Sequence, residues 1–367
     1  MLDSLTIRNF RLFEDLTIER LGRVNLIVGK NNSGKSCLLE AIELLVSGFS
    51  PQVVFGILER RSEYQAPLTS SRPERLAPAR NSDPHPVSNL FFGRSLENTS
   101  IRLQADAGKN RIDLRVDAAY YADNDRHRPE YLGPQPVIGA ANRRFLQIHR
   151  LADGNESPRP LLPLDLDLAE AVSHLGTSGG PAIVQVSATG LSGDDIGRYW
   201  NALALQPLQR RVVAALTAVF PEILDVTVNY DPDLGEYLIR VRLADGGITT
   251  VNSLGDGVRR LFGLLLAVTA ARNGFLLIDE IEIGLHWSVQ QALWQSLFTF
   301  AEDLDVQVFA TTHSEDTVSA FASVWSGHED AGAFHRLQQH PKTRKATVHT
   351  YELETLSGSL ETDSEVR

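Results

Sequence analysis

The stretch GKNNSGKS, residues 29–36, constrains the fold of this chain more than any other part of the sequence. It satisfies the pattern G-x-x-x-x-G-K-[ST] and lies between the apolar run VNLIV and SCLLEAIELL, whose apolar residues repeat at helical spacing. A strand, a glycine loop and a helix in this order form a phosphate-binding loop, because backbone N–H groups and the helix N-terminus can surround phosphate oxygens. The chain has thirty Arg and only five Lys, so two lysines within this loop indicate a site rather than a chance match.

The phosphate-binding loop predicts the contacts of a nucleotide. Lys35 would reach the β- and γ-phosphates, and the hydroxyl of Ser36 would bind Mg²⁺. No N-K-x-D motif for reading guanine occurs in the sequence, so we expect ATP and Mg²⁺ as the cofactors. The predicted nucleotide-binding residues of the loop are Gly29, Lys30, Asn31, Asn32, Ser33, Gly34, Lys35, Ser36 and Cys37.

The segment LLIDEIEIGLH, residues 276–286, carries three carboxylates directly after an apolar run that predicts a buried strand. In a parallel sheet this strand would end near the phosphate-binding loop, so Asp279 can hold Mg²⁺ directly or through water. Glu280 points to the other side of the strand end and can take a proton from an attacking water. The plainer alternative is that Asp279 caps the element that follows the strand and that Glu280 is a solvated loop residue.

Two further motifs supply candidate phosphate contacts. VFATTHSED is another predicted buried strand and ends at His313, whose imidazole can hydrogen-bond a γ-phosphate. NSLGDGVRRL places Ser253, Gly255 and Gly257 before a long predicted helix, as a second anion-binding helix start. Taken singly, such a histidine is more often a core or capping residue, and such a glycine-rich segment is more often a turn with an N-cap.

Strands that alternate with helices along the chain predict an α/β fold with a largely parallel sheet. Pro, Ser, Asn and charged residues are frequent between the first helix and residue 180, and within this part TSIRLQADAGKNRIDLRVDAAYY predicts an antiparallel hairpin. The predicted divisions are an ATPase core at 1–48 and 226–350, a variable insertion of antiparallel strands and loops at 49–180, a helical lobe segment at 181–225, and a flexible tail at 351–367.

Composition limits the location and the partners. The chain is 43% hydrophobic and has one cysteine, Cys37, which excludes an internal disulfide and fits a reducing cytoplasm. The start lacks the pattern of a secretion signal, and Arg272 and Asn273 interrupt the most apolar stretch, so we expect neither export nor a membrane span. A net charge of −11 argues against a protein that coats nucleic acid by bulk attraction.

The order of these motifs resembles ABC-type ATPase heads, in which a phosphate loop, S-x-G-x-G before a helix, a strand ending in DE and a strand ending in His follow one another. Within that class, LLIDEIEIGLH and ATTHSED resemble the OLD and AAA15-type bacterial ATPases. The resemblance covers residues 1–48 and 181–350. It implies a P-loop NTPase of the ABC-type head fold, with a mixed N-terminal sheet, a central largely parallel sheet and a helical or insertion lobe.

The same resemblance implies a homodimer that sandwiches the nucleotide. One subunit would contribute the phosphate loop with Lys35, Asp279 as metal ligand, and Glu280 and His313 as catalytic residues; the other would contribute Ser253 and Gly255. The wording departs from that of transporter ATPases, because Asp256 separates the two glycines and no Gln follows.

Two other residues receive roles only through the resemblance. Such heads place a glutamine near Mg²⁺, for which Gln185 is preferred over Gln147, although such residues are more often ordinary polar residues of strands. Glu282 lies in the segment that contacts the opposing subunit in such heads.

An ATP-hydrolysing switch that controls an effector or a nucleic acid is the predicted function, and the resemblance implies anti-phage defence as its context. OLD proteins carry a Toprim nuclease domain after the ATPase, but only 54 residues follow His313 here, so we expect a separately encoded Toprim-type nuclease or toxin. DNA is a candidate partner, with patches at Arg143, Arg144 and Arg150 or at Arg210 and Arg211. Two alternatives stay open: a RecF-like DNA-repair clamp, and a weakly hydrolysing scaffold that holds a toxin or nuclease inactive.

Overall fold

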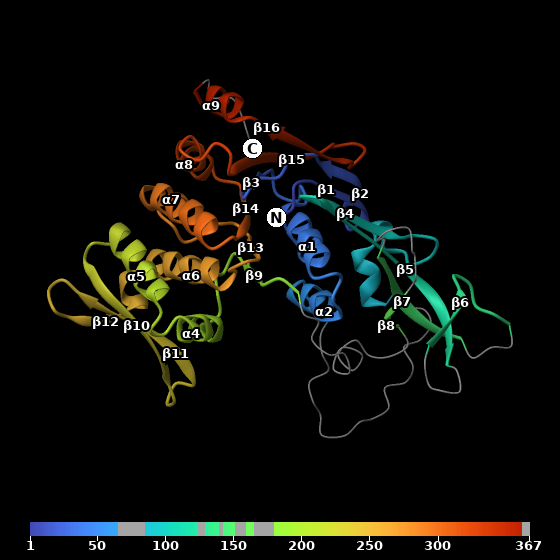
Figure 1. The fold of residues 1–367 in the computed structure, drawn as a ribbon, viewed down its shortest axis with the longest axis horizontal. Helices are drawn as coiled ribbons and strands as arrows, with labels where there is room; N and C mark the ends of the chain where they lie inside the picture. Colours follow the sequence, from blue (N-terminus) through green and yellow to red (C-terminus); the bar gives the residue numbers. More distant parts are fainter. Residues whose placement is uncertain (65–84, 124–128, 139–141, 151–158, 165–179, 362–367) are drawn as a thin grey trace.

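Three sheets organise the part of the chain that the structure describes (Figure 1). The structure is a computed structural model, and it describes residues 1–64, 85–123, 129–138, 142–150, 159–164 and 180–361. In Figure 1 a seven-stranded sheet lies on one side of the central six-stranded sheet, and a lobe of helices with a three-stranded sheet lies on the other.

The central sheet confirms the predicted α/β fold, because all but one of its strand pairs are parallel. The strands that lead to the predicted site residues are fully buried, as their apolar runs require. In spatial order the strands are β16 (Ala346–Tyr351), β15 (Gly332–Gln339), β3 (Val24–Val28), β14 (Gln307–Thr312), β13 (Phe275–Ile278) and β9 (Ile183–Val186).

Helices cover both faces of the central sheet. Alternate residues of its strands point to opposite sides, and the apolar side chains on each side pack in a separate core cluster. Leu277 packs in the cluster that contains α1 (Lys35–Val46), the helix of the phosphate-binding loop. Its neighbours Leu276 and Ile278 pack in the cluster of α6 (Asp256–Ala270), α7 (Trp287–Asp303) and α8 (Glu315–Trp325). The parallel strands β3, β13 and β14 therefore end at the same edge of the sheet, between these two layers of helices.

The N-terminal sheet is antiparallel and joins segments that are far apart in the sequence. Its path is β2 (Phe13–Ile18), β1 (Leu5–Phe10), β4 (Ile101–Ala107), β5 (Asn110–Asp123), β7 (Arg143–Arg150) and β8 (Arg159–Pro163), with β6 (Pro129–Gly133) paired to β5. The predicted hairpin is β4 and β5. Since β4 pairs with β1, the predicted insertion continues the sheet that the first residues begin. Along the chain, α2 (Pro51–Arg60), η1 (Pro86–Leu90) and η2 (Phe92–Arg94) lie between α1 and β4.

The helical lobe combines helices with a small meander. Its helices are α4 (Gly193–Ala202) and α5 (Pro207–Val219), and its strands are β10 (Ile223–Asp231), β11 (Glu236–Leu243) and β12 (Ile248–Thr250). Val226, Val228 and Val241 turn inward into the core cluster that α4, α5 and α6 also enter. The predicted boundaries assign these strands to the ATPase core, but in the structure they form a separate sheet on the lobe (Figure 1).

The last segment corrects one expectation. Residues 351–367 were expected to be a flexible tail, but α9 (Leu353–Glu361) is a helix, and its Leu356 is fully buried. Leu353, Leu356 and Leu360 lie on one face of this helix at i, i+3 and i+7, and this apolar face packs beside α8. Residues 362–367 lie outside the described part. Among the helices of the described residues, none has the length and apolar character needed to cross a membrane.

Candidate functional site

The phosphate-binding loop follows β3 and owes its shape to two glycines. A side chain at Gly29 would collide with the carbonyl oxygen of Leu337 on the neighbouring β15. Gly34 has φ 106° and caps α1, and an added Cβ there would lie 2.9 Å from the ring of Phe13. Both positions therefore exclude other residues for steric reasons, as the motif predicted.

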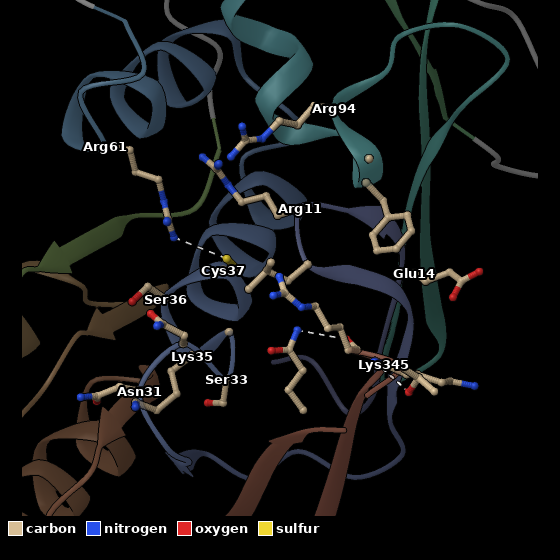
Figure 2. A pocket seen from close by; sticks show the side chains of 18 of the residues that line it. Arg11, Glu14, Asn31, Ser33, Lys35, Ser36, Cys37, Arg61, Arg94 and Lys345 are labelled. Atoms are coloured by element: carbon tan, nitrogen blue, oxygen red, sulfur yellow. Dashed lines mark hydrogen bonds between the residues drawn. The ribbon is translucent and has the colours of Figure 1, made fainter. Parts of the chain in front are cut away.

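Lys35 lies inside the loop and is almost fully buried (Figure 2). Its Nζ donates a hydrogen bond of 2.7 Å to the carbonyl of Gly29. Burial lowers the pKa of Lys35, whereas the charges of Glu280, Asp279 and Glu282 act to raise it. The predicted lysine and the predicted carboxylates thus lie in one electrostatic environment.

A chain of hydroxyl and carboxylate groups joins α1, β13 and β14. Ser36 Oγ donates to Asp279 Oδ2 at 2.9 Å, and Thr311 Oγ1 donates to Asp279 Oδ1 at 2.6 Å. Thr311 also accepts the backbone N–H of Glu280 at 2.9 Å. The sequence analysis missed Thr311, although a hydroxyl at the end of a buried apolar strand was a usable signal.

Glu280 and His313 face each other beside the loop. Glu280 has a left-handed backbone, with φ 49°, and its side chain is one quarter exposed on the wall of the cavity that also contains Lys35. His313 Nδ1 lies 3.7 Å from Glu280 Oε1 but only 3.0 Å from Glu282 Oε1. The imidazole therefore lies within ion-pair distance of both glutamates and closer to the second.

Glu282 corrects an expectation. We expected it to contact an opposing subunit, but only 9% of its side chain is exposed, and it bonds to its own chain. Its Oε1 accepts the backbone N–H of His313 at 3.0 Å, and the imidazole Nδ1 lies 3.0 Å from the same oxygen, within ion-pair distance. Burial of a carboxylate is costly unless donors compensate it. His313 serves Oε1, whereas Oε2 is buried without a hydrogen-bond partner among the described residues.

Arg260 on α6 is a further buried residue that the sequence analysis missed. Its guanidinium donates to the carbonyl oxygens of Ser187 at 2.7 Å and Glu280 at 3.1 Å, with Asp279 at 3.4 Å. Burial lowers the pKa of Arg260, and the charges of Glu282 and Asp279 oppose that change. Arg260 therefore connects α6 to the backbone of the acidic segment.

The structure does not bring the predicted signature residues to the site of their own chain. Ser253 lies in η3 (Val251–Leu254), where its hydroxyl is 3.1 Å from that of Thr250. Gly255 caps α6 with φ 99°, and an added Cβ would meet nothing within 4 Å. Gly257 lies inside the first turn of α6 rather than before it. These residues are exposed or only partly buried.

The two candidate glutamines lie in different places. Gln147 is buried in the N-terminal sheet, where it bonds to Tyr121 and Asp117. Gln185 pairs with Leu277 in the central sheet. Leu277 lies two residues before Asp279 and packs on the face of the sheet that α1 covers, so Gln185 lies on that face as well. Its Oε1 is buried and has no hydrogen-bond partner among the described residues. The geometry thus favours Gln185 over Gln147.

Cys37, the last predicted loop residue, faces away from the loop. Arg61 donates to its Sγ at 3.5 Å, as the dashed line in Figure 2 shows. Burial raises the pKa of the Cys37 thiol to about 11. Only the backbone N–H of Cys37 is left to serve a phosphate.

The arginines that were candidates for DNA contact are largely engaged within the chain. Arg211 forms an ion pair with Asp303, and Arg144 lies over the ring of Tyr120. Arg143 lies over Phe145. These contacts engage one arginine of the pair at 210 and 211 and two of the three arginines of the other patch.

A cavity of about 1050 Å³ opens beside the phosphate-binding loop (Figure 2). One wall consists of Asn31 to Cys37 with Glu280. Leu12 and Phe92, both more than one third exposed, lie on other walls. The volume is at the upper end for small-molecule sites and suits a nucleoside triphosphate.

Comparisons with known proteins identify the family and the fold. The family model described as "AAA domain, putative AbiEii toxin, Type IV TA system" matches residues 24–319. An "ATP/GTP phosphatase" of Helicobacter pylori is 22% identical over 352 residues, which cover 88% of each chain. The Rad50 DNA double-strand break repair ATPase of Archaeoglobus fulgidus is 32% identical over 96 residues, 26% of this chain and 10% of that one. The Smc head domain of Pyrococcus furiosus, solved with ScpA, has the same fold, with a TM-score of 0.52, 13% identity and 99% of each chain covered.

Proposed function

This chain belongs to the family described as "AAA domain, putative AbiEii toxin, Type IV TA system" and is a P-loop ATPase with the fold of an ABC-type head. On this basis we propose that it is a dimeric switch in which ATP hydrolysis controls a separate partner. The observation that carries the proposal is the bonded chain from Ser36 through Asp279 to Thr311, which fixes the carboxylates beside the phosphate-binding loop. The finer assignment to the OLD or AAA15 type rests on LLIDEIEIGLH and ATTHSED alone.

The nucleotide would lie in the large cavity with its phosphates in the loop. Backbone N–H groups of residues 31–37 and the ammonium of Lys35 would bind the phosphates. The uncharged base would lie against the exposed apolar surfaces of Leu12 and Phe92.

Mg²⁺ fits the residues that meet at the strand ends. The hydroxyl of Ser36 and the carboxylate of Asp279 are hard oxygen ligands, and their oxygens lie 2.9 Å apart. Gln185 is a third candidate, since its buried Oε1 is not bonded within the described residues. When bound, the ion would neutralise charge on the phosphates.

Hydrolysis requires a base for water and a group that responds to the γ-phosphate. Glu280 borders the cavity next to Lys35 and would accept the proton of the attacking water. Glu282 would accept the Nδ1 proton of His313, which leaves Nε2 to face the phosphate. Glu282 is therefore proposed as a positioning residue for His313.

The exposed residues around α6 support a second subunit. Ser253 and Gly255 can bind phosphate only outside their own chain, as a trans contribution to a partner's nucleotide. Ile283 lines a hollow with Asp256 at the start of α6, and Ile283 and Trp287 are 40% and 65% exposed although both are large and apolar. A homodimer through the nucleotide sandwich would cover these residues.

The partner controlled by the switch is proposed to be a separately encoded toxin or nuclease. The family description names a toxin of a Type IV toxin–antitoxin system, which supports a partner of this kind. Anti-phage defence remains the proposed context. Co-elution of the purified protein with a protein encoded beside it would support this part of the proposal.

Steady-state ATP hydrolysis tests the switch directly. The rate at which wild type releases phosphate should rise in proportion to the concentration of dimer. Glu280→Gln should bind ATP and form a long-lived dimer but release almost no phosphate. If wild type binds ATP but neither protein turns it over under dimerising conditions, the switch is wrong and the scaffold alternative holds.

A further inference from the structure

The turn between β15 and β16 concentrates positive charge in an acidic chain. HPKTRK, residues 340–345, holds two of the five lysines together with Arg344, whereas the whole chain carries a net charge of −11. All six residues are exposed. A surface turn that only needs to stay solvated carries mixed charges as readily as one sign, so this cluster requires another explanation.

The turn keeps its shape without its charged side chains. The backbone N–H of His340 donates to the carbonyl of Lys345 at 2.9 Å, and that of Arg344 donates to the carbonyl of His340 at 2.8 Å. The Nδ1 of His340 accepts the backbone N–H groups of Lys342 and Thr343 at 3.3 and 3.1 Å. The cations at 342, 344 and 345 are therefore presented on an ordered frame.

These three cations have no side-chain partner within the described residues. Glu14 shares the large cavity with Arg344 and Lys345, yet it forms no ion pair with them in the described part of the chain. Because the charges neither build the turn nor neutralise an acid, they are available to a ligand.

The turn stands between two hollows that both reach the phosphate-binding loop. Arg344 and Lys345 line the cavity of about 1050 Å³, and His340 lines a second one of about 570 Å³ beside residues 30–33. Figure 2 shows Lys345 on the far side of the cavity from Lys35. The phosphates of a nucleotide are already served by the loop, and its base and ribose carry no charge. The turn thus supplies more positive charge than the nucleotide needs.

We propose that the β15–β16 turn is a docking surface for the phosphodiester backbone of a nucleic acid. Regularly spaced phosphates suit a row of three cations that are exposed and unpaired. An anionic membrane fits less well, because basic membrane-binding segments carry about four to eight cations and this turn has three. This surface differs from the arginine patches that the sequence suggested.

Docking at this turn would also reach the ATPase site through the sheet. β15 pairs in parallel with β3, with Arg336 opposite Val28, the last strand residue before the phosphate-binding loop. The turn and the loop therefore extend from adjacent strands at the same sheet edge. A bound strand would change the rate of ATP turnover.

Charge reversal of the turn, compared with an equal change elsewhere, tests the proposal. The test variant is K342E/R344E/K345E, and the matched control is K109E/R240E/R272E, whose cations are also exposed and have no side-chain partner among the described residues. Fluorescence anisotropy would measure binding of labelled single-stranded DNA, duplex DNA and RNA over a range of salt. Wild type and control should bind; the turn variant should bind at least about tenfold more weakly, with a salt slope smaller by about 2 to 3.

Three results would overturn the proposal. These are equal affinity of the turn variant and wild type, absence of nucleic-acid binding by wild type at low salt, and a parallel loss of ATP affinity in the turn variant, which would assign the cations to the nucleotide. A fluorescent ATP analogue measures the last point and does not depend on hydrolysis. If charge reversal prevents folding, the neutral variant K342Q/R344Q/K345Q should show the same order of affinities.

Discussion

The acidic strand ends and the start of α6 differ in how many contacts their predicted site residues make within one chain. At the strand ends, Ser36, Asp279 and Thr311 are bonded to one another, and Glu282 holds His313. At the start of α6, Gly255 has open space around it. One half of the proposed site is therefore organised before any nucleotide binds, whereas the other half has no role inside its own chain. This difference indicates a site that two chains complete.

The largest effect is expected in the organised half. Lys35→Ala should weaken ATP binding about 100-fold, because it removes a charged contact to the phosphates from a buried position. A fluorescent ATP analogue measures this affinity. Lys109→Ala is the control, since Lys109 is exposed in the turn before β5. Equal affinity of the two variants would contradict the assignment of the loop.

In the open half, turnover should be lost without loss of affinity. Ser253→Arg should keep ATP binding within about twofold, because Ser253 does not touch its own phosphate-binding loop, but should reduce turnover by more than about tenfold. Light scattering with ATP present should find the variant monomeric. A variant that hydrolyses ATP at the wild-type rate would remove the difference between the two halves.

Glu282→Gln tests the inner support of the organised half. The amide keeps the shape of the side chain but loses its charge, so His313 is held less firmly, and kcat should fall about three- to tenfold while KM changes little. Asp316→Asn, an exposed change in the first turn of α8, is the control. A rise in KM at constant kcat would instead show that Glu282 supports ATP binding.

The smallest effect is expected at Cys37. Its thiol faces Arg61, so Cys37→Ala should leave kcat and KM nearly unchanged and lower the free energy of unfolding by about 1 kcal/mol. Urea unfolding measures the free energy of unfolding, and steady-state kinetics measure kcat and KM. A large change in KM would place the side chain, rather than only the backbone, at the nucleotide.

The sequence predicts those parts of the molecule that depend on local chemistry. The phosphate-binding loop, the buried strands before Asp279 and His313, and the hairpin at Gly108 follow from residue spacing and glycine positions. Thr311 and Arg260 act through contacts with residues 20 to 73 positions away in the sequence, and the periodicity of a sequence does not encode such long-range contacts. The pairing of β4 with β1 is likewise long-range. The helix α9 was missed although its leucines carried the signal.

The most direct test of the central claim mixes two inactive variants. Glu280→Gln breaks the organised half and Ser253→Arg breaks the open half, so a mixed dimer contains one doubly broken site and one intact site. Mixed before ATP is added, the two variants should give turnover well above the sum of their separate residual rates, up to about one quarter of the wild-type rate per subunit if half of the dimers are mixed. If the two variants exchange subunits and turnover stays at the sum of the separate residual rates, each chain works alone, and a site shared between two chains is wrong.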